Sequence, residues 1–206
     1  MDFVTTPHKH ADAIFAQPEY RKQWDEIQAA IKAISEEDLK NAFPTSTNTK
    51  SLSNVINKLL EKELVLRGWT PQAQIFHGPI YESSKKRPSM WRLDFAKQDI
   101  SVEVAFNHGE ATAWNLLKPV IASELNHVEK AIQTKIGVVI FATNELKKVG
   151  GFDSAVGTYE KALTYLTPLN AFLPVPLMLI GLLPPKTFKM DVKQEGPKKI
   201  GHIVDL

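Results

Sequence analysis

In the first third of the chain, apolar residues recur every three or four positions, and this spacing predicts helices. One helix is expected over residues 18–34, because Pro18 is a residue that fits a first helical turn. Ser35 precedes three acidic residues and is expected to cap a short second helix. A third helix is predicted over residues 51–66, with Gly68 at its end.

After Trp69 the pattern alternates between strands and helices. Strands are predicted over residues 73–81, 91–96, 100–106, 135–142 and 177–183, and helices over 112–131 and 153–166. Pro119 is expected to bend or interrupt the first of these helices. The alternation predicts an α/β fold with a mixed central sheet flanked by helices. We expect one domain, with a mainly helical part over residues 1–68, an α/β core over 69–183 and a basic tail over 184–206.

The composition removes several classes of chemistry. None of the 206 residues is a cysteine, so disulfides, zinc–thiolate sites and thiol nucleophiles are excluded. The amino terminus lacks the pattern of a signal peptide, and the apolar run over residues 173–183 is too short to span a bilayer. We therefore expect a soluble, cytoplasmic protein. No glycine-rich phosphate loop and no Gly-x-Ser-x-Gly motif occurs.

The net charge is only +2, but the cations are clustered. Lys85, Lys86, Arg87 and Arg92 lie in a stretch without acids, and five lysines lie between residues 186 and 199. On charge alone, two solvated surface segments explain this clustering. The alternative is that these cations contact phosphates, which requires clustered cations rather than a high total charge.

Two acids on a predicted hairpin are the strongest candidates for chemistry. Asp94 lies on its first strand, and Glu103 lies in the second between Val102 and Val104. A carboxylate buried among apolar residues costs several kcal/mol unless a cation or donor meets it. Two carboxylates brought together across a hairpin suit Mg²⁺, which prefers oxygen ligands. By spacing alone, two ordinary acids on a hairpin are the more common outcome, and the metal site is the minority interpretation.

The order of elements and several short motifs resemble a known family. The chain resembles the BglII-type restriction endonucleases (the group of BglII, BstYI and BamHI) within the PD-(D/E)xK nuclease superfamily. The resemblance is carried by residues 10–14, 63–65 with Trp69, 94–95, 102–104 with Phe106, 123–125 with His127, 159–160 with Leu163, and 176–181.

This resemblance implies a type II restriction endonuclease that hydrolyses both strands of double-stranded DNA at a short palindrome. It implies a homodimer that depends on Mg²⁺, for which Mn²⁺ substitutes, and that is paired with a cognate DNA methyltransferase in the host. By position, Asp94 and Glu103 would be metal ligands, together with the backbone carbonyl of Val104. Residues 69–183 would then be the catalytic core.

One position departs from the family pattern. The third active-site residue of the family is usually Gln, Glu or Lys, and this chain has Ala105 there. Another side chain could reach into the site, and Glu63, Glu124 and Lys97 are the candidates, of which we take Glu63 as catalytic. Alternatively, a phosphate oxygen of the substrate positions the water, or the protein is a slow or inactive nuclease.

The resemblance also implies which residues contact DNA. Asn107, His108, Asp153 and Ser154 occupy the positions that read base edges, and their side chains suit the major groove. Lys85, Lys86, Arg87 and Arg92 would contact the phosphate backbone. A polar loop and a helix cap would account for the same residues without any role in binding.

Two other functions remain open at this point. One is a repair-type nuclease with the same core. The other is a non-catalytic or weakly active DNA-binding protein that has kept the fold, which Ala105 would permit.

Overall fold

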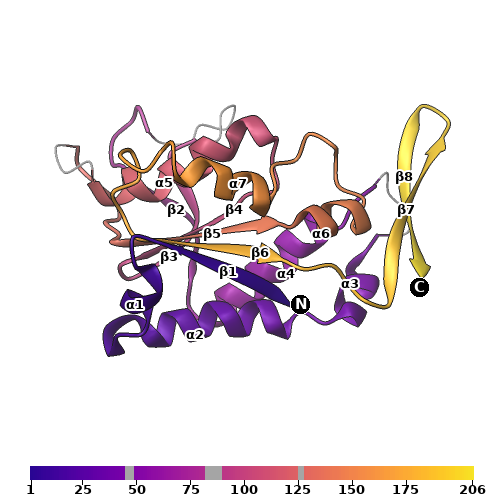
Figure 1. Ribbon diagram of the computed structural model, residues 1–206, viewed down its shortest axis with the longest axis horizontal. Helices are drawn as coiled ribbons and strands as arrows, with labels where there is room; N and C mark the ends of the chain where they lie inside the picture. Colours follow the sequence, from indigo (N-terminus) through magenta and orange to yellow (C-terminus); the bar gives the residue numbers. More distant parts are fainter. Residues whose placement is uncertain (45–48, 82–89, 125–127) are drawn as a thin grey trace.

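The computed structural model describes residues 1–44, 49–81, 90–124 and 128–206. Its centre is a six-stranded sheet with helices on both faces (Figure 1). The strand order is β1-β6-β5-β4-β3-β2. The strands are β1 (Phe3–His8), β2 (Thr70–Gln74), β3 (Arg92–Lys97), β4 (Ile100–Val104), β5 (Ile136–Ala142) and β6 (Leu177–Leu182). The α/β class with a mixed, helix-flanked sheet is thus confirmed.

Strand direction explains the mixed sheet. β2, β3 and β4 pair antiparallel, whereas β4, β5 and β6 pair parallel, and β1 closes the edge antiparallel to β6. All seven residues of β5 are buried, as expected of a central parallel strand covered on both faces. The parallel strands require crossover connections, and helices provide them.

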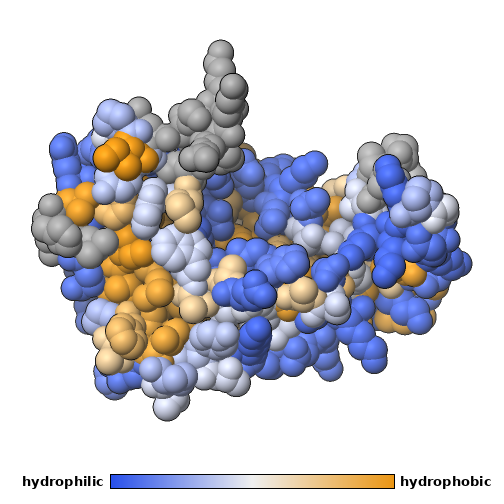
Figure 2. All heavy atoms as spheres, turned by 90° about the horizontal axis from the view of Figure 1, so that it is seen from above, coloured by the Kyte–Doolittle hydropathy of each residue, from blue (hydrophilic) through white to orange (hydrophobic). Residues whose placement is uncertain are grey.

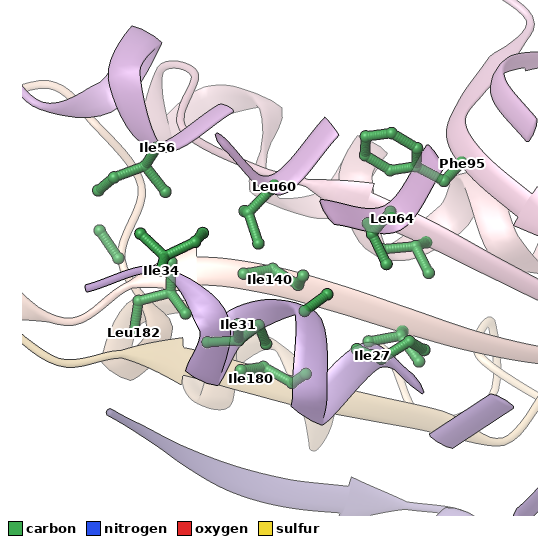
Figure 3. Packing of buried hydrophobic residues seen from close by; sticks show 14 of the residues in the cluster. Ile27, Ile31, Ile34, Ile56, Leu60, Leu64, Phe95, Ile140, Ile180 and Leu182 are labelled. Atoms are coloured by element: carbon green, nitrogen blue, oxygen red, sulfur yellow. The ribbon is translucent and has the colours of Figure 1, made fainter. Parts of the chain in front are cut away.

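The amino-terminal helices cover one face of the sheet. They are α1 (Ala11–Phe15), α2 (Pro18–Ala33), α3 (Glu36–Ala42) and α4 (Ser53–Leu66). The apolar sides of α2 and α4 meet each other and the sheet, as the side chains of Ile31, Leu60 and Ile140 illustrate (Figure 3). Ser35 caps α3 through a capping box with Asp38, as its sequence predicts.

Two helices cover the other face, namely α5 (Thr112–Glu124) and α7 (Tyr159–Leu166) (Figure 1). Leu116 and Val120 of α5 pack with Val139 of β5 and Leu179 of β6. Pro119 lies inside α5 and is buried. At this point Gly137 of β5 lets the helix approach closely, because a Cβ atom there would lie 2.5 Å from Cβ of Pro119.

Several boundaries differ from the predicted ones. α5 is described as far as Glu124, and residues 128–131, where the predicted helix would end, are not helical; α7 begins at Tyr159 rather than near residue 153. β2 spans Thr70–Gln74, so the prediction of a strand over residues 73–81 was wrong in its placement. The polar strand β1 and the short helices α1 and α6 (Asn144–Val149) were not predicted.

The segment expected as a basic tail forms a hairpin of β7 (Phe188–Glu195) and β8 (Lys198–Asp205). The hairpin lies at one end of the molecule (Figure 1). The backbone N–H of Gly201 donates to the carbonyl of Thr49, 3.1 Å away, which connects the hairpin to the segment before α4. Figure 2 shows apolar residues gathered toward the opposite end of one face and hydrophilic residues over most of the rest.

No helix within the described ranges is long and apolar enough to cross a membrane.

Candidate active site

The two candidate acids lie where β3 and β4 begin to separate. The strands pair from Lys97↔Ile100 to Phe95↔Val102, and Asp94 and Glu103 follow directly on the two strands. The backbone N–H of Val104 donates to Oδ2 of Asp94 at 2.7 Å. The backbone N–H of Asp94 donates to Oε1 of Glu103 at 3.3 Å. The hairpin therefore places both carboxylates side by side and fixes one oxygen of each.

Burial makes Glu103 an unusual acid. Its residue is 1% exposed. Burial, and next the negative charge of Asp94, raise the pKa of Glu103 from 4.5 to about 8, while the ammonium of Lys118 opposes this rise. A carboxylate in such a place is ionised only when a cation stands beside it. The site is thus built to take up positive charge.

Lys118 of α5 provides one such charge. Its Nζ forms an ion pair with Oε2 of Glu103, and its side chain is 13% exposed. The same Nζ donates to the carbonyl of Arg92 at 3.1 Å. Glu103 therefore connects the Asp94 backbone on one side with the ammonium of α5 on the other.

A small pocket of about 150 Å³ opens beside Asp94, on the side of α4. Asn57, Glu61, Gln72, Asp94, Phe95 and Val104 line it. Asn57 and Glu61 are one helical turn apart, so α4 presents both to the same place. Oδ1 of Asn57 is buried and has no hydrogen-bond partner in the described part of the chain. A bound cation or water would satisfy such an acceptor.

The residues of this site fit a hard divalent cation. Three of the residues that line the pocket carry oxygen ligands: Asp94 and Glu61 have carboxylates, and Asn57 has an amide oxygen. Glu103 adds a buried carboxylate next to the half-buried Asp94. No cluster of three or more His, Cys, Asp or Glu in metal-binding geometry occurs within the described ranges. The acids alone therefore do not complete a coordination shell, and neutral oxygen donors are needed as well.

The candidates for the third active-site group lie elsewhere. Glu63 forms an ion pair with Arg67 at 2.6 Å and does not line the pocket, because it points to a different side of α4 from Glu61. Lys97 forms an ion pair with Glu26 at 2.7 Å. Glu124 is the exposed last residue of α5. The structure therefore does not bring Glu63 to Asp94 and Glu103, although the sequence suggested it.

The four base-reading candidates lie in two neighbouring segments. His108 forms a β-bridge with Val156, and the backbone N–H of Gly157 donates to the carbonyl of Asn107 at 3.0 Å. Asn107, His108, Asp153 and Ser154 are all exposed. The structure thus joins the two segments into one polar surface next to the carboxyl end of β4.

Two of these side chains already have partners. The Asn107 amide is in reciprocal hydrogen bonds with Asn115, at 2.8 and 3.3 Å. Asp153 binds the ammonium of Lys50 at 2.7 Å, and this hydrogen bond is the main cause that lowers the pKa of Asp153 to about 2.

Of the four basic residues in the segment before Asp94, the structure describes Arg92. Lys85, Lys86 and Arg87 lie outside the described residues. Arg92 is half-buried at the start of β3, where its Nε donates to Oε1 of Gln74 at 3.4 Å.

Sequence reasoning missed Lys118, Glu61 and Asn57. For Lys118 a signal existed, since this lysine interrupts the apolar run of residues 116–121. A cation on the buried side of a helix needs a partner, and the buried Glu103 is that partner. For Glu61 and Asn57, nothing in the sequence indicates which side of α4 faces β3.

A mixed sheet flanked by helices, with two acids at the point where β3 and β4 separate, is the arrangement that the resemblance to restriction endonucleases predicts. A family model described as "Restriction endonuclease BglII/BglIII" matches residues 3–182, and the chain belongs to this family. The protein is therefore a type II site-specific deoxyribonuclease by family, and restriction endonucleases generally use divalent metal ions.

Solved structures agree on the fold. The crystal structure of BglII complexed with a DNA 16-mer matches the chain with a TM-score of 0.65 and 19% sequence identity. The crystal structure of free BglII matches it with a TM-score of 0.56 and 20% sequence identity. Each comparison covers 100% of both chains. A search of curated proteins finds no significant match.

Proposed function

We propose that the protein is a Mg²⁺-dependent restriction endonuclease that cuts both strands of double-stranded DNA at a short palindrome. The observation that carries this proposal is the pairing of Asp94 with the buried Glu103 across the β3–β4 hairpin. Two carboxylates fixed side by side repel each other, and a divalent cation between them relieves this repulsion.

In this proposal Asp94 and Glu103 hold the cation, with the carbonyl of Val104 and the Asn57 amide oxygen as neutral donors at the same place. A bound Mg²⁺ would supply Lewis acidity and a more acidic water. The backbone of the chain holds the two carboxylates in position. The Val104 N–H and the Asp94 N–H each fix one carboxylate oxygen, so the acids do not have to reorganise during the reaction.

The reaction is the addition of water to a DNA phosphodiester. The water oxygen forms a bond to phosphorus, the bond from phosphorus to one ester oxygen breaks, and the water proton passes to solvent. The departing ester oxygen takes a proton from solvent. No covalent enzyme intermediate is required, which agrees with the absence of cysteine and of a Gly-x-Ser-x-Gly motif in the sequence.

DNA contacts would come from the joined loops and the basic segment. Asn107, His108, Asp153 and Ser154 form one exposed polar surface that would read base edges, with Lys85, Lys86, Arg87 and Arg92 on phosphates. BglII itself was crystallised with a DNA 16-mer. A palindrome has a two-fold axis, so we expect two copies of the chain to bind it as a homodimer.

A second function is favoured by one observation. Ala105 places a methyl group where the family has a polar side chain, and a lysine already neutralises Glu103. The protein could then bind DNA in a sequence-specific way and cleave it slowly or not at all.

Digestion of a large, methylation-free DNA tests the proposal. The purified protein is incubated with this DNA and Mg²⁺, and the fragment ends are sequenced, with Asp94→Asn in parallel. Ends that share one short palindrome support the proposal, and Asp94→Asn should produce none. Random ends would point to a repair-type nuclease. Specific retardation in a gel without cleavage, in Mg²⁺ and Mn²⁺, would point to the non-catalytic binder.

A further inference from the structure

The side chain of Ala105, which stands where the family has a polar residue, faces α5. Ala105 is 1% exposed and follows Glu103 by two residues, so both side chains lie on the same side of the extended chain. The Ala105 N–H donates to the carbonyl of Ile140 at 2.8 Å, which keeps this segment against β5. Its methyl group packs in the cluster that contains Leu116 and Val120. A functional group missing at Ala105 is therefore missing from the surface between β4 and α5.

Lys118 of α5 places its ammonium group beside Glu103 of β4. It lies on α5, and its ammonium contacts Glu103 and the Arg92 carbonyl. Its backbone is held in place by the next residue, since Pro119 packs against Gly137 without room for a Cβ atom. A lysine fixed in this way already holds its ammonium beside the two acids, so its long side chain does not lose further conformational freedom during the reaction.

We propose, on the basis of the function proposed above, that Lys118 is the third functional group of the active site and replaces from α5 what Ala105 lacks on β4. Its ammonium, held by Glu103, contacts a non-bridging oxygen of the scissile phosphate. It stabilises the additional negative charge that this phosphate carries as the water oxygen bonds to phosphorus.

The charges of the site support this role. Asp94, Glu103 and Glu61 together carry three negative charges when ionised, and a divalent cation balances two of them. The ammonium of Lys118 balances the third, so that the loaded site does not repel an anionic phosphate. Without Lys118 the site would keep a net negative charge, and Lys97 could not replace its ammonium, because Lys97 is bonded to Glu26 and to the Arg67 carbonyl.

Lys97 also provides a matched control. Both lysines are partly buried, both pair with a glutamate and both donate to a backbone carbonyl. They differ in that the partner of Lys97 is Glu26 on α2, not an acid of the candidate site. Lys97→Met therefore measures the cost of losing such a pair alone.

The test compares the wild-type protein with Lys118→Met, Lys118→Gln, Lys118→Arg and Lys97→Met. Single-turnover cleavage is measured with saturating protein, and DNA affinity is measured in Ca²⁺. Binding of Mn²⁺ alone is measured by calorimetry, and folding by thermal melting. Lys118→Gln guards against a folding defect, because its amide can still donate to Glu103.

We expect Lys118→Met and Lys118→Gln to cleave about 100-fold to 1000-fold more slowly, the range for removing one donor to a transition state. Lys118→Arg should retain more activity than Lys118→Gln, and Lys97→Met should cleave at the wild-type rate. Mn²⁺ affinity of the Lys118 variants should be unchanged or tighter, since the cation no longer competes with an ammonium for Glu103.

Cleavage by folded Lys118→Gln within about threefold of Lys97→Met would overturn the proposal. So would a loss of Mn²⁺ affinity in Lys118→Gln whose rate recovers fully at high Mn²⁺, because Lys118 would then only position Glu103. If the wild-type protein cleaves no DNA, the proposed function itself fails, and this role of Lys118 fails with it.

Discussion

Asp94 and Glu103 are joined by a hydrogen bond from the backbone N–H of the first to Oε1 of the second, 3.3 Å long. Asp94 in turn accepts from the Val104 N–H at 2.7 Å. Each acid is thus positioned by the backbone of the opposite strand, in place of the ladder hydrogen bonds that the separating strands no longer form. The same separation that ends the pairing of β3 and β4 creates the site.

Asp94→Asn should remove cleavage with little change in fold. The amide oxygen can still accept from the Val104 N–H, but it carries no charge for a divalent cation. We expect the rate of DNA cleavage to fall by about 100-fold or more. Asp99→Asn, at the turn of the same hairpin, is the control, because Asp99 pairs with Lys135 away from the pocket. Equal rates for the two variants would contradict the role of Asp94.

The metal-free protein should lose stability as the pH rises from about 5 to about 8. In the folded state the pKa of Glu103 is about 8, above its usual 4.5, so between these values the folded protein holds a proton that the unfolded chain has released. The free energy of unfolding therefore decreases with rising pH across this window, by about 1.4 kcal/mol for each unit of separation at most. Urea unfolding at several pH values measures the decrease.

Glu103→Gln is the control for this pH dependence. Its amide does not titrate, so the decrease that belongs to position 103 should be absent. If the free energy of unfolding changed with pH equally in both proteins, Glu103 would ionise in the folded state as freely as in the unfolded chain.

Gly137→Ala should destabilise the contact between α5 and the sheet. The new Cβ atom would lie 2.5 Å from Cβ of Pro119 and 2.6 Å from Cδ2 of Leu177, which forces α5 or β6 to move. Overpacking of this kind costs about 1–3 kcal/mol, measurable by urea unfolding. Because Lys118 precedes Pro119, cleavage should also become slower. A stability equal to that of the wild-type protein would mean that α5 lies farther from β5.

Asp153→Asn should change which DNA sequences are bound best. Asp153 is exposed beside His108, and Lys50 keeps it ionised, so it can accept from a base amine as a carboxylate. The expected change is about 1–3 kcal/mol in discrimination at one base position, measured with a panel of DNA duplexes. The carboxylate of Asp205 pairs with Lys40, so Asp205→Asn should leave the preference for particular DNA sequences unchanged. A uniform loss of affinity across the panel would contradict base reading.

The sequence predicted the elements whose apolar pattern is strong. α2, α4 and the buried strand β5 lie close to their predicted positions, because their packing against the core requires the pattern that reveals them. The β7–β8 hairpin was missed because most of its side chains are polar or exposed, so burial imposes no clear alternation. β1 was missed for a similar reason, since four of its six residues are not apolar.

The residues of the candidate site also fall into those that the sequence predicts and those that it does not. The adjacency of Asp94 and Glu103 follows from local geometry, because a hairpin fixes which residues oppose each other. Lys118 and Glu61 come from helices, and their places depend on how α5 and α4 are rotated against the sheet. Glu61 and Glu63 flank the same buried face of α4 at Leu60 and Leu64, so helical spacing alone cannot choose between them.

The most direct measurement is an anomalous difference map from crystals of the protein with its DNA and Mn²⁺. The account predicts a Mn²⁺ peak in direct contact with carboxylate oxygens of both Asp94 and Glu103, next to a DNA phosphate. A peak held by other residues, or Mn²⁺ bound to the DNA with neither carboxylate in contact, would contradict it.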